Sequence, residues 1–309
     1  MVKIRKFERE YIDEALKLFI EAYERQRKKV PLIPKRKNLQ KEIEESLRKD
    51  CDDPGVAAFQ DDDLVGYMIE NARADDFMGE KTAFSLNLYS QSSVERRKKI
   101  IYQQMYERLS EIWVEEGYHT HIFSIWAPDD ELTYNFFRLG FGMTHFELLR
   151  DLSDLDVTNT SVSFKRLENR EPIKYLDQKH NKFYPKAPLF WLPPDDDNAN
   201  YDEIEGEIIA AFQKDEPVGY IYLKKNDAET WLMTDERTCR VAGAYVDSDH
   251  RGRGIGKALL QKAIEWAEEE DLERLYVEGE SANIYGGNFW MKHFTPVVYT
   301  VRRCIDRRA

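Results

Sequence analysis

The feature that most constrains the fold of this chain is an internal repeat. Residues 57–69 read AAFQDDDLVGYMI, and residues 210–222 read AAFQKDEPVGYIY. A second match joins residues 137–141 (FRLGF) to residues 290–294 (WMKHF), and the members of both matches lie 153 positions apart. A constant separation predicts a tandem duplication of one structural unit. We expect domains at residues 1–152 and 160–309, because the segment between them is rich in Ser, Asp, Asn and Thr and suits a linker.

The pattern within each copy predicts a mixed α+β unit. Residues 57–69 and 210–222 each read as strand, acidic turn and strand, which is typical of a β-hairpin. After the second hairpin we expect a strand at 239–246, a helix at 256–270 and a strand at 274–279. Apolar residues recur in that helix at a spacing of three to four, which predicts one buried face: Leu259, Leu260, Ala263, Ile264 and Ala267.

Charge excludes several classes of partner. The 309 residues include 58 acidic and 46 basic side chains, a net charge of −12. Proteins that bind duplex nucleic acid or anionic membranes need Lys and Arg to neutralise phosphates, so this balance argues against both partners. No apolar run approaches the ~20 residues that span a bilayer, and the N-terminus lacks the apolar core of a signal peptide. We therefore expect a cytoplasmic protein.

Cysteine and histidine usage predicts no metal. The three cysteines, Cys51, Cys239 and Cys304, have no CxxC spacing, so they form neither a disulfide framework nor a zinc site. His119 and His121 would share one strand face, but they have no third ligand nearby, and we expect a structural role for them.

A glycine-rich loop occurs in the second half alone. Residues 251–257 read RGRGIGK, between the strand expected at 239–246 and the following helix. Glycine lets the backbone approach a ligand closely, and the N–H groups of a helix N-terminus attract anions. A P-loop is excluded because Arg251 stands at its first glycine and Ala258 at its hydroxyl position. A Rossmann loop is excluded because Leu259 stands at its third glycine.

These motifs, in this order, resemble the GNAT superfamily of acyl-CoA-dependent N-acyltransferases. Arg251-x-x-Gly254-x-Gly256 is similar to the pyrophosphate loop of that family, and Asn283 followed by Trp290 and Phe294 is similar to its C-terminal motif. The resemblance implies two GNAT-like domains, each a mixed, mostly antiparallel, splayed sheet flanked by helices. It also implies acetyl-CoA as co-substrate, bound by Tyr245, Val246, Arg251, Gly252, Arg253, Gly254, Ile255, Gly256, Lys257 and Asn283.

The first half departs from the family pattern at this loop. No glycine occurs between Glu80 and Glu116. An alignment of Ile101 with Leu260 places Ser92, Glu95 and Arg97 opposite Arg251, Gly254 and Gly256. We therefore expect a degenerate N-terminal copy that does not bind CoA in the family manner.

Acyl transfer to an amine needs a proton acceptor. An alkylammonium of pKa near 10.4 leaves about one molecule in 2,500 neutral at pH 7, equivalent to roughly 4.6 kcal/mol. By resemblance Glu278 is the general base, with Glu280 as the alternative, and the backbone N–H of Val246 meets the oxyanion. The family commonly has a tyrosine where this chain has Trp290, and an indole cannot act as a general acid. Tyr285 is the substitute candidate for that role.

The acceptor site is the least visible part of the sequence. By resemblance the segment from Tyr184 to Glu205 grips the acceptor, and its aromatic and acidic residues suit a cationic amine, although they also suit a solvated loop. They are Tyr184, Phe190, Trp191, Asp195, Asp196, Asp197, Tyr201, Asp202 and Glu203. Each half has room for one strand after Phe141 or Phe294, where the family commonly has two. The other half of the chain, or a second copy in a homodimer, is expected to complete the acceptor rim.

The sequence thus predicts an N-acetyltransferase that acts on a primary amine of a small molecule or peptide, with catalysis in the second half. A non-catalytic CoA-binding or interaction module is the alternative, because Trp290 replaces the usual tyrosine. A different acyl donor is a third possibility, disfavoured by the CoA-type loop.

Overall fold

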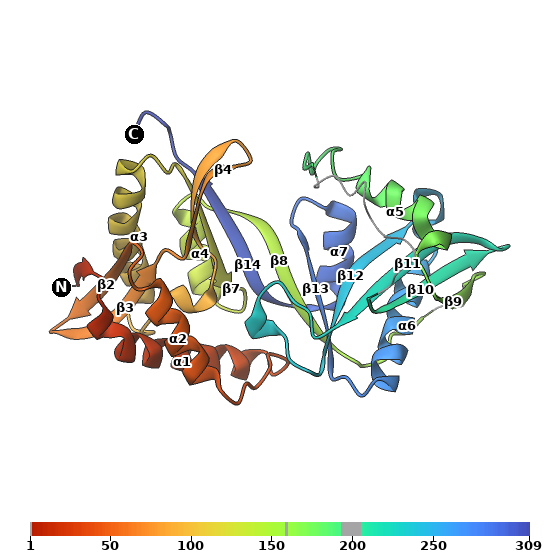
Figure 1. The fold of residues 1–309 in the computed structure, drawn as a ribbon, viewed down its shortest axis with the longest axis horizontal. Helices are drawn as coiled ribbons and strands as arrows, with labels where there is room; N and C mark the ends of the chain where they lie inside the picture. The colour runs from red at the N-terminus through yellow and green to blue at the C-terminus, as the bar shows by residue number, and fades with distance from the viewer. Residues whose placement is uncertain (1, 158–159, 193–204) are drawn as a thin grey trace. The chain divides into compact units, whose positions relative to one another are not determined.

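The computed structural model describes residues 2–157, 160–192 and 205–309. The chain divides into two compact units, which are described separately. Unit 1 is Met1–Phe146 with Pro296–Ala309, and unit 2 is Glu147–Thr295. Both units mix helices with largely antiparallel strands, so the predicted α+β class is confirmed (Figure 1).

Unit 1 begins with a four-stranded antiparallel sheet in the order β1-β2-β3-β6. The helix α3 packs on β2 and β3 of that sheet, and α1 packs on β3 and β6. Its further strands follow the order β4-β5-β7-β14-β8. The elements are β1 (Lys3–Lys6), α1 (Ile12–Lys29), α2 (Leu39–Asp50), β2 (Gly55–Gln60), β3 (Asp63–Ile69), β4 (Ala72–Phe77), β5 (Glu80–Ser85), β6 (Gln91–Ser93), α3 (Lys98–Glu115), β7 (Thr120–Trp126), α4 (Asp130–Arg138), β8 (Gly142–Asp151) and β14 (Thr295–Cys304).

Unit 2 is built on the strand order β13-β12-β11-β10-β9. All neighbours are antiparallel except β12 and β13, which are parallel. The helix α6 packs on β10 to β13, α5 packs on β11 and β12, and α7 packs on β13. The elements are β9 (Ser163–Leu167), α5 (Lys174–Asn181), β10 (Glu207–Gln213), β11 (Glu216–Lys225), β12 (Thr238–Val246), α6 (Ile255–Glu269), β13 (Arg274–Glu280) and α7 (Ile284–His293).

The repeated glycine of the hairpins explains how each unit packs its central helix. A Cβ on Gly219 would lie 3.0 Å from the Tyr245 carbonyl oxygen and 3.3 Å from Cδ1 of Leu259 in α6. A Cβ on Gly66 would lie 2.7 Å from Cγ2 of Ile101 in α3. The helix crosses the hairpin closely in both units, so a side chain at either glycine would displace it. The apolar face predicted for α6 is buried against the sheet.

The strands β12 and β13 pair over a short stretch and then separate. Their register joins Thr238 to Arg274 and continues only as far as Arg240 and Tyr276. Beyond this point β12 runs on to Val246 and β13 to Glu280. The splayed sheet predicted from the resemblance is therefore present in unit 2, and the gap opens at the C-terminal end of β12.

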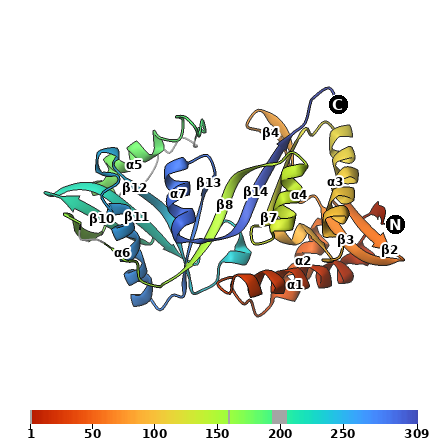
Figure 2. The same ribbon diagram turned by 180° about the vertical axis from the view of Figure 1, so that it is seen from behind.

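Each unit is completed by a strand that the other half of the sequence supplies. The last strand, β14, belongs to unit 1, where it pairs antiparallel with β7 from Val298 and Trp126 to Cys304 and Thr120 (Figures 1 and 2). The end of β8, residues 147–151, belongs to unit 2. The compact units therefore differ from consecutive domains at 1–152 and 160–309. The exchange accounts for the single strand that each half has after its Phe141 or Phe294 motif.

No helix among the described residues is long and apolar enough to cross a membrane. His121 has the structural role expected of it: the ring is buried, with Nδ1 2.9 Å from the Tyr106 hydroxyl and Nε2 3.0 Å from the Tyr118 carbonyl oxygen. Burial lowers the pKa of His121 to about 4, so the ring is neutral at physiological pH.

Candidate active site

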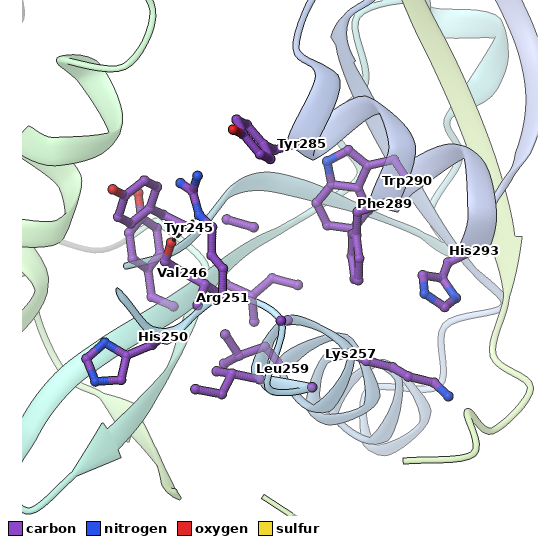
Figure 3. A pocket seen from close by; sticks show the side chains of 18 of the residues that line it. Tyr245, Val246, His250, Arg251, Lys257, Leu259, Tyr285, Phe289, Trp290 and His293 are labelled. Atoms are coloured by element: carbon purple, nitrogen blue, oxygen red, sulfur yellow. Dashed lines mark hydrogen bonds between the residues drawn. The ribbon is translucent and has the colours of Figure 1, made fainter. Parts of the chain in front are cut away.

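A pocket of about 460 Å³ lies in unit 2 at the gap between β12 and β13. It is lined by the end of β12, residues 250–252 and 254 of the following loop, the first turns of α6, and α7 (Figure 3). All of the predicted cofactor-binding residues line it except Arg253, whose guanidinium donates to the Asp249 carbonyl oxygen at 2.8 Å. Of the predicted catalytic residues, Val246 and Tyr285 line the pocket and Glu278 does not.

The N-terminus of α6 presents bare backbone to this pocket. Its N-cap residue, Gly254, has φ +81° and gives no side-chain cap to the helix. Gly252 also has positive φ, +74°, and a Cβ there would meet open space. Because the first N–H groups of a helix have no intrahelical acceptor and carry the positive end of the helix dipole, this end of α6 is suited to an anion.

The charge of the pocket is opposite in sign to that of the whole chain. Arg251, Lys257 and Lys292 line it, and none of its described lining residues is acidic. Burial, together with the charges of Lys292, Arg150 and Lys257, lowers the pKa of His293 at its edge. In a protein of net charge −12 this is a local positive field, which favours phosphate over cationic ligands at this position.

Arg251 reaches into the pocket and is held by backbone and aromatic rings. Its Nε donates to the Val246 carbonyl oxygen at 3.0 Å. Its guanidinium carbon lies 5.3 Å from the ring centre of Tyr245 and 5.1 Å from that of Tyr285, distances typical of cation–π contacts (Figure 3). Phe183, which follows α5, lies at 5.9 Å on the same guanidinium.

The backbone N–H of Val246 points into the gap. The N–H of Asp247 donates to the Val218 carbonyl oxygen at 2.9 Å, which makes Asp247 and Val218 a hydrogen-bonded pair. Hydrogen-bonded and non-hydrogen-bonded pairs alternate along an antiparallel ladder, so the neighbouring pair, Val246 and Gly219, is of the second kind. The Val246 N–H therefore faces away from β11, toward the side from which β13 has diverged. This is the orientation that an oxyanion donor needs.

Asn283 lines the pocket and also caps α7. Its Oδ1 accepts a hydrogen bond from the Gly286 N–H at 3.0 Å, and Asn283 is the N-cap residue of that helix. Asn283 therefore combines a capping role with a place in the pocket wall.

We predict that Asn283→Ala lowers the free energy of unfolding of the protein by about 1 kcal/mol, because one N–H at the start of α7 loses its acceptor. Urea unfolding measures the loss. The matched variant Asn283→Asp keeps an acceptor oxygen and should retain most of the stability, whereas equal destabilisation by both variants would assign another role to the side chain.

The aromatic residues of α7 face the pocket rather than the core. Phe289 and Trp290 are both only partly buried, and both line the pocket. A Cβ on Gly256 would lie 3.7 Å from the Phe289 ring, so α6 and α7 approach closely here. Tyr285 is 59% exposed, and its ring covers Arg251 at the mouth (Figure 3).

Glu278 lies in a polar network on β13. Its carboxylate forms an ion pair with Arg240 of β12, which also pairs with Asp227 at 2.9 Å. The Tyr276 hydroxyl lies 2.7 Å from Glu278 Oε2. Glu280, two residues further on, is also absent from the pocket lining.

The segment expected to grip the acceptor is described in part. Tyr184 packs between His180 and Trp191, with both ring centres 5.3 Å from its own. Phe190 is 73% exposed. The acidic and aromatic residues Asp195, Asp196, Asp197, Tyr201, Asp202 and Glu203 lie outside the described residues. The sequence did not point to His180 and Phe183, which also line the pocket, or to Lys292 and His293 at the end of α7.

The alignment of the first-half loop was wrong. The N–H of Val94 donates to the Val65 carbonyl oxygen at 3.0 Å, as Asp247 does to Val218 in unit 2. Ser93 pairs with Gly66 as Val246 pairs with Gly219, so Ser93 corresponds to Val246. The N-cap of α3 is Arg97, which has φ +63° and therefore corresponds to Gly254.

The loop of unit 1 therefore differs from that of unit 2 in its length as well as in its side chains. Residues 94–97 connect β6 to α3, a connection half as long as residues 247–254 in unit 2. The space at the start of α3 holds the buried Lys98, whose ammonium pairs with Asp129 at 2.7 Å and with Glu95 at 2.8 Å.

Comparison with known proteins agrees with this geometry. Residues 173–294 match the acetyltransferase (GNAT) family. Unit 2 therefore carries a domain of that family, and the family predicted from the motifs is confirmed. The chain is 31% identical over 120 residues to streptothricin acetyltransferase A of Bacillus subtilis, covering 38% of this chain and 62% of that protein. It is 32% identical over 107 residues to an uncharacterized N-acetyltransferase of Methanocaldococcus jannaschii, covering 34% of this chain and 40% of that protein.

The fold of the whole chain is also found among solved structures. A GCN5-related N-acetyltransferase from Sphaerobacter thermophilus superposes with a TM-score of 0.58 at 11% sequence identity, over 98% of this chain and 95% of that one. At this identity the likeness concerns the fold alone. The matching stretches span less than two thirds of the two sequence relatives.

Proposed function

We propose that unit 2 transfers an acetyl group from acetyl-CoA to a primary amine, by direct attack of the amine on the thioester. The observation that carries this proposal is the uncapped N-terminus of α6, which opens into a cationic pocket beside two diverging strands. Membership of the GNAT family supports acyl transfer as the reaction class.

The residues of the pocket fit the pyrophosphate of a CoA molecule. A Cβ at Gly252 would meet open space, Gly254 has positive φ, and a Cβ at Gly256 would make only ordinary contact with Phe289. Arg251 and Lys257 supply cations at the same end of α6. We expect the loop 251–257 to bind the pyrophosphate, and Asn283 and Phe289 to contact the arm that leads to the thioester.

Two groups of unit 2, the Val246 N–H and the Glu278 carboxylate, are proposed to catalyse the transfer. Acetyl-CoA supplies a thioester carbonyl that an uncharged amine can attack. The Val246 N–H, directed into the gap, is the donor for the oxyanion. Glu278, which forms an ion pair with Arg240, removes the proton from the acceptor ammonium.

The leaving thiolate needs a proton donor, and Tyr285 is the candidate on α7. Trp290 offers only an indole N–H, which does not titrate. Tyr285 of α7 lines the pocket, and its side chain is exposed. We therefore propose its hydroxyl as the proton donor to the thiolate. A thiol of pKa near 8.5 also departs without help, so loss of this hydroxyl should have a smaller effect than loss of the base.

The acceptor is proposed to be a small molecule or a peptide N-terminus. The Bacillus subtilis relative is named for streptothricin, which makes that compound a sensible member of an acceptor panel. The tyrosine and carboxylate side chains beside the splay suit a cation: Tyr184 lies near enough to Glu280 for the carboxylate to raise the pKa of the phenol, in addition to the larger effect of burial.

The test is thiol release from acetyl-CoA by the full chain, with and without amines. The panel comprises streptothricin, spermidine, free lysine and short peptides with free N-termini. We expect amine-dependent release with at least one of them. Binding of acetyl-CoA without release on any amine would favour a non-catalytic CoA-binding module, the alternative suggested by Trp290. Absence of acetyl-CoA binding would contradict both and favour another acyl donor.

A further inference from the structure

A buried carboxyl group lies behind Glu278 and has no part in the pocket. Glu147 is 2% exposed and belongs to unit 2 through the end of β8, a strand that the first half of the sequence supplies. The Thr230 hydroxyl donates to its Oε1 at 2.6 Å, and the Tyr276 hydroxyl lies 2.9 Å from its Oε2. None of the salt bridges between described residues includes Glu147. A buried carboxylate without a cation is costly, so this group needs an explanation.

The Tyr276 hydroxyl lies between two carboxyl groups. It is 2.9 Å from Glu147 Oε2 and 2.7 Å from Glu278 Oε2. A phenol carries one proton and can donate to only one of them, so the other carboxyl group must itself be protonated and donate to the phenol oxygen. Glu278 forms an ion pair with Arg240, whereas no salt bridge between described residues includes Glu147, so we place the proton on Glu147.

The surroundings of Glu147 agree with this assignment. Burial raises the pKa of Glu147 to about 7, and the nearby charges of Glu278 and Glu229 act in the same direction. The hydrogen bonds from Thr230 and Tyr276 act against them. The charged groups next along the network are Arg240 and its second partner, Asp227. Glu147 therefore changes charge at the pH at which an acetyltransferase must deprotonate its acceptor.

We propose that Glu147 receives, through the Tyr276 hydroxyl, the proton that Glu278 removes from the acceptor ammonium. The inference rests on the function proposed above. The step begins with Glu147 ionised. An N–H bond of the ammonium breaks and the proton binds Glu278. Glu278 passes a proton to the Tyr276 oxygen while Tyr276 passes its own to Glu147. The net change is a neutral amine and a neutral Glu147, which returns the proton to solvent before the next turnover.

The first test compares pH profiles of kcat/KM for one acceptor in wild type, Glu147→Gln and Tyr276→Phe. Glu147 and Tyr276 act through Glu278, so both variants should bind acetyl-CoA as wild type does. Each should lose about tenfold in kcat/KM at pH 7.5 and lose the rise of the wild-type profile near pH 7, because no relay remains. Thr230→Val removes a hydrogen bond that lowers the pKa of Glu147, so it should move the rise to higher pH. Glu268→Gln, an exposed carboxyl on α6, is the matched control and should change nothing.

The second test locates the proton without using activity. An unfolded Glu has a pKa near 4.5, and the folded value near 7 means that the folded state binds this proton more tightly. The contribution of Glu147 to the free energy of unfolding is therefore fully present below pH 4.5, and it is lost as the pH rises to 7. Relative to Glu147→Gln, the folding equilibrium constant of wild type should fall about tenfold per pH unit across that window. Urea unfolding at several pH values measures it.

The outcomes separate the two proposals. No amine-dependent transfer by wild type overturns the proposed function and the relay together, and the unfolding data still report where the proton lies. Transfer by wild type with an unchanged pH profile in Glu147→Gln overturns the relay alone. A stability difference that does not vary between pH 4.5 and 7 also overturns it, because Glu147 then carries no proton to exchange.

Discussion

Gly254→Glu should weaken acetyl-CoA binding by about 100-fold. Gly254 is the N-cap of α6 and has φ +81°. A carboxylate placed there would lie close to the bound pyrophosphate, and two like charges about 5 Å apart repel by roughly 3 kcal/mol at an effective dielectric constant near 20. That energy corresponds to about two orders of magnitude in Kd. Isothermal titration with acetyl-CoA measures the change.

Two further variants separate charge from strain. Gly79 has φ +82° in unit 1, and a Cβ there would meet open space. Gly79→Glu therefore introduces the same charge and the same left-handed strain, about 1–2 kcal/mol. Gly79 belongs to unit 1, whereas the predicted site belongs to unit 2. It should bind acetyl-CoA as wild type does. Gly254→Asn tolerates positive φ without a charge and should give an intermediate loss. Equal affinity of wild type and Gly254→Glu would refute the assigned site.

Glu278→Gln should lower kcat by about 100-fold or more and leave the Kd for acetyl-CoA unchanged. General base catalysis contributes roughly 10²–10⁴ to a rate, and an amide cannot take the proton. Glu278 lies outside the pocket lining, so the cofactor site should not respond. Arg240 keeps its second partner, Asp227, which limits the effect of the variant on folding.

Glu280→Gln is the matched control for this prediction. It removes the same charge two residues further along β13, at the position that the sequence offered as the alternative base. We expect kcat within about threefold of wild type. If kcat falls in Glu280→Gln and is retained in Glu278→Gln, Glu280 is the general base and Glu278 is not. Single-turnover measurement at saturating acetyl-CoA separates the chemical step from binding.

The sequence was most informative where a pattern is local. The hairpins, the helix α6 and the strands β12 and β13 follow from periodicity and repeat spacing, and their observed bounds lie within three residues of those predicted. The glycine loop could be assigned because its glycines at alternate positions stand in the family order with Asn283 and the C-terminal motif. The cofactor residues implied by the family motif then line the pocket, apart from Arg253.

The features that the sequence did not reveal depend on contacts between distant segments. Nothing in residues 295–304 indicates that β14 pairs with β7, because a strand pattern does not specify its partner. The shortened loop of unit 1 was missed because the two halves were aligned on the apolar residues of the helix. Alignment on the strand would have matched Ser93 with Val246. Glu147 gave no signal, since its importance lies in its contacts with Tyr276 and Thr230.

The shortened loop gives a physical reason for the predicted asymmetry between the halves. In unit 1 the start of α3 follows β6 after four residues and is occupied by the Lys98 ion pairs with Asp129 and Glu95. In unit 2 the longer loop leaves the start of α6 bare. We therefore propose that unit 2 alone binds acetyl-CoA, and that unit 1 has a structural role or contributes part of the acceptor pocket.

Hydrogen–deuterium exchange of the full chain, with and without acetyl-CoA, tests this central claim most directly, because it reports which backbone amides the ligand protects. The account predicts slower exchange at residues 246–257 and no change at residues 93–98. Protection at residues 93–98, or no protection in either segment at saturating acetyl-CoA, would contradict it.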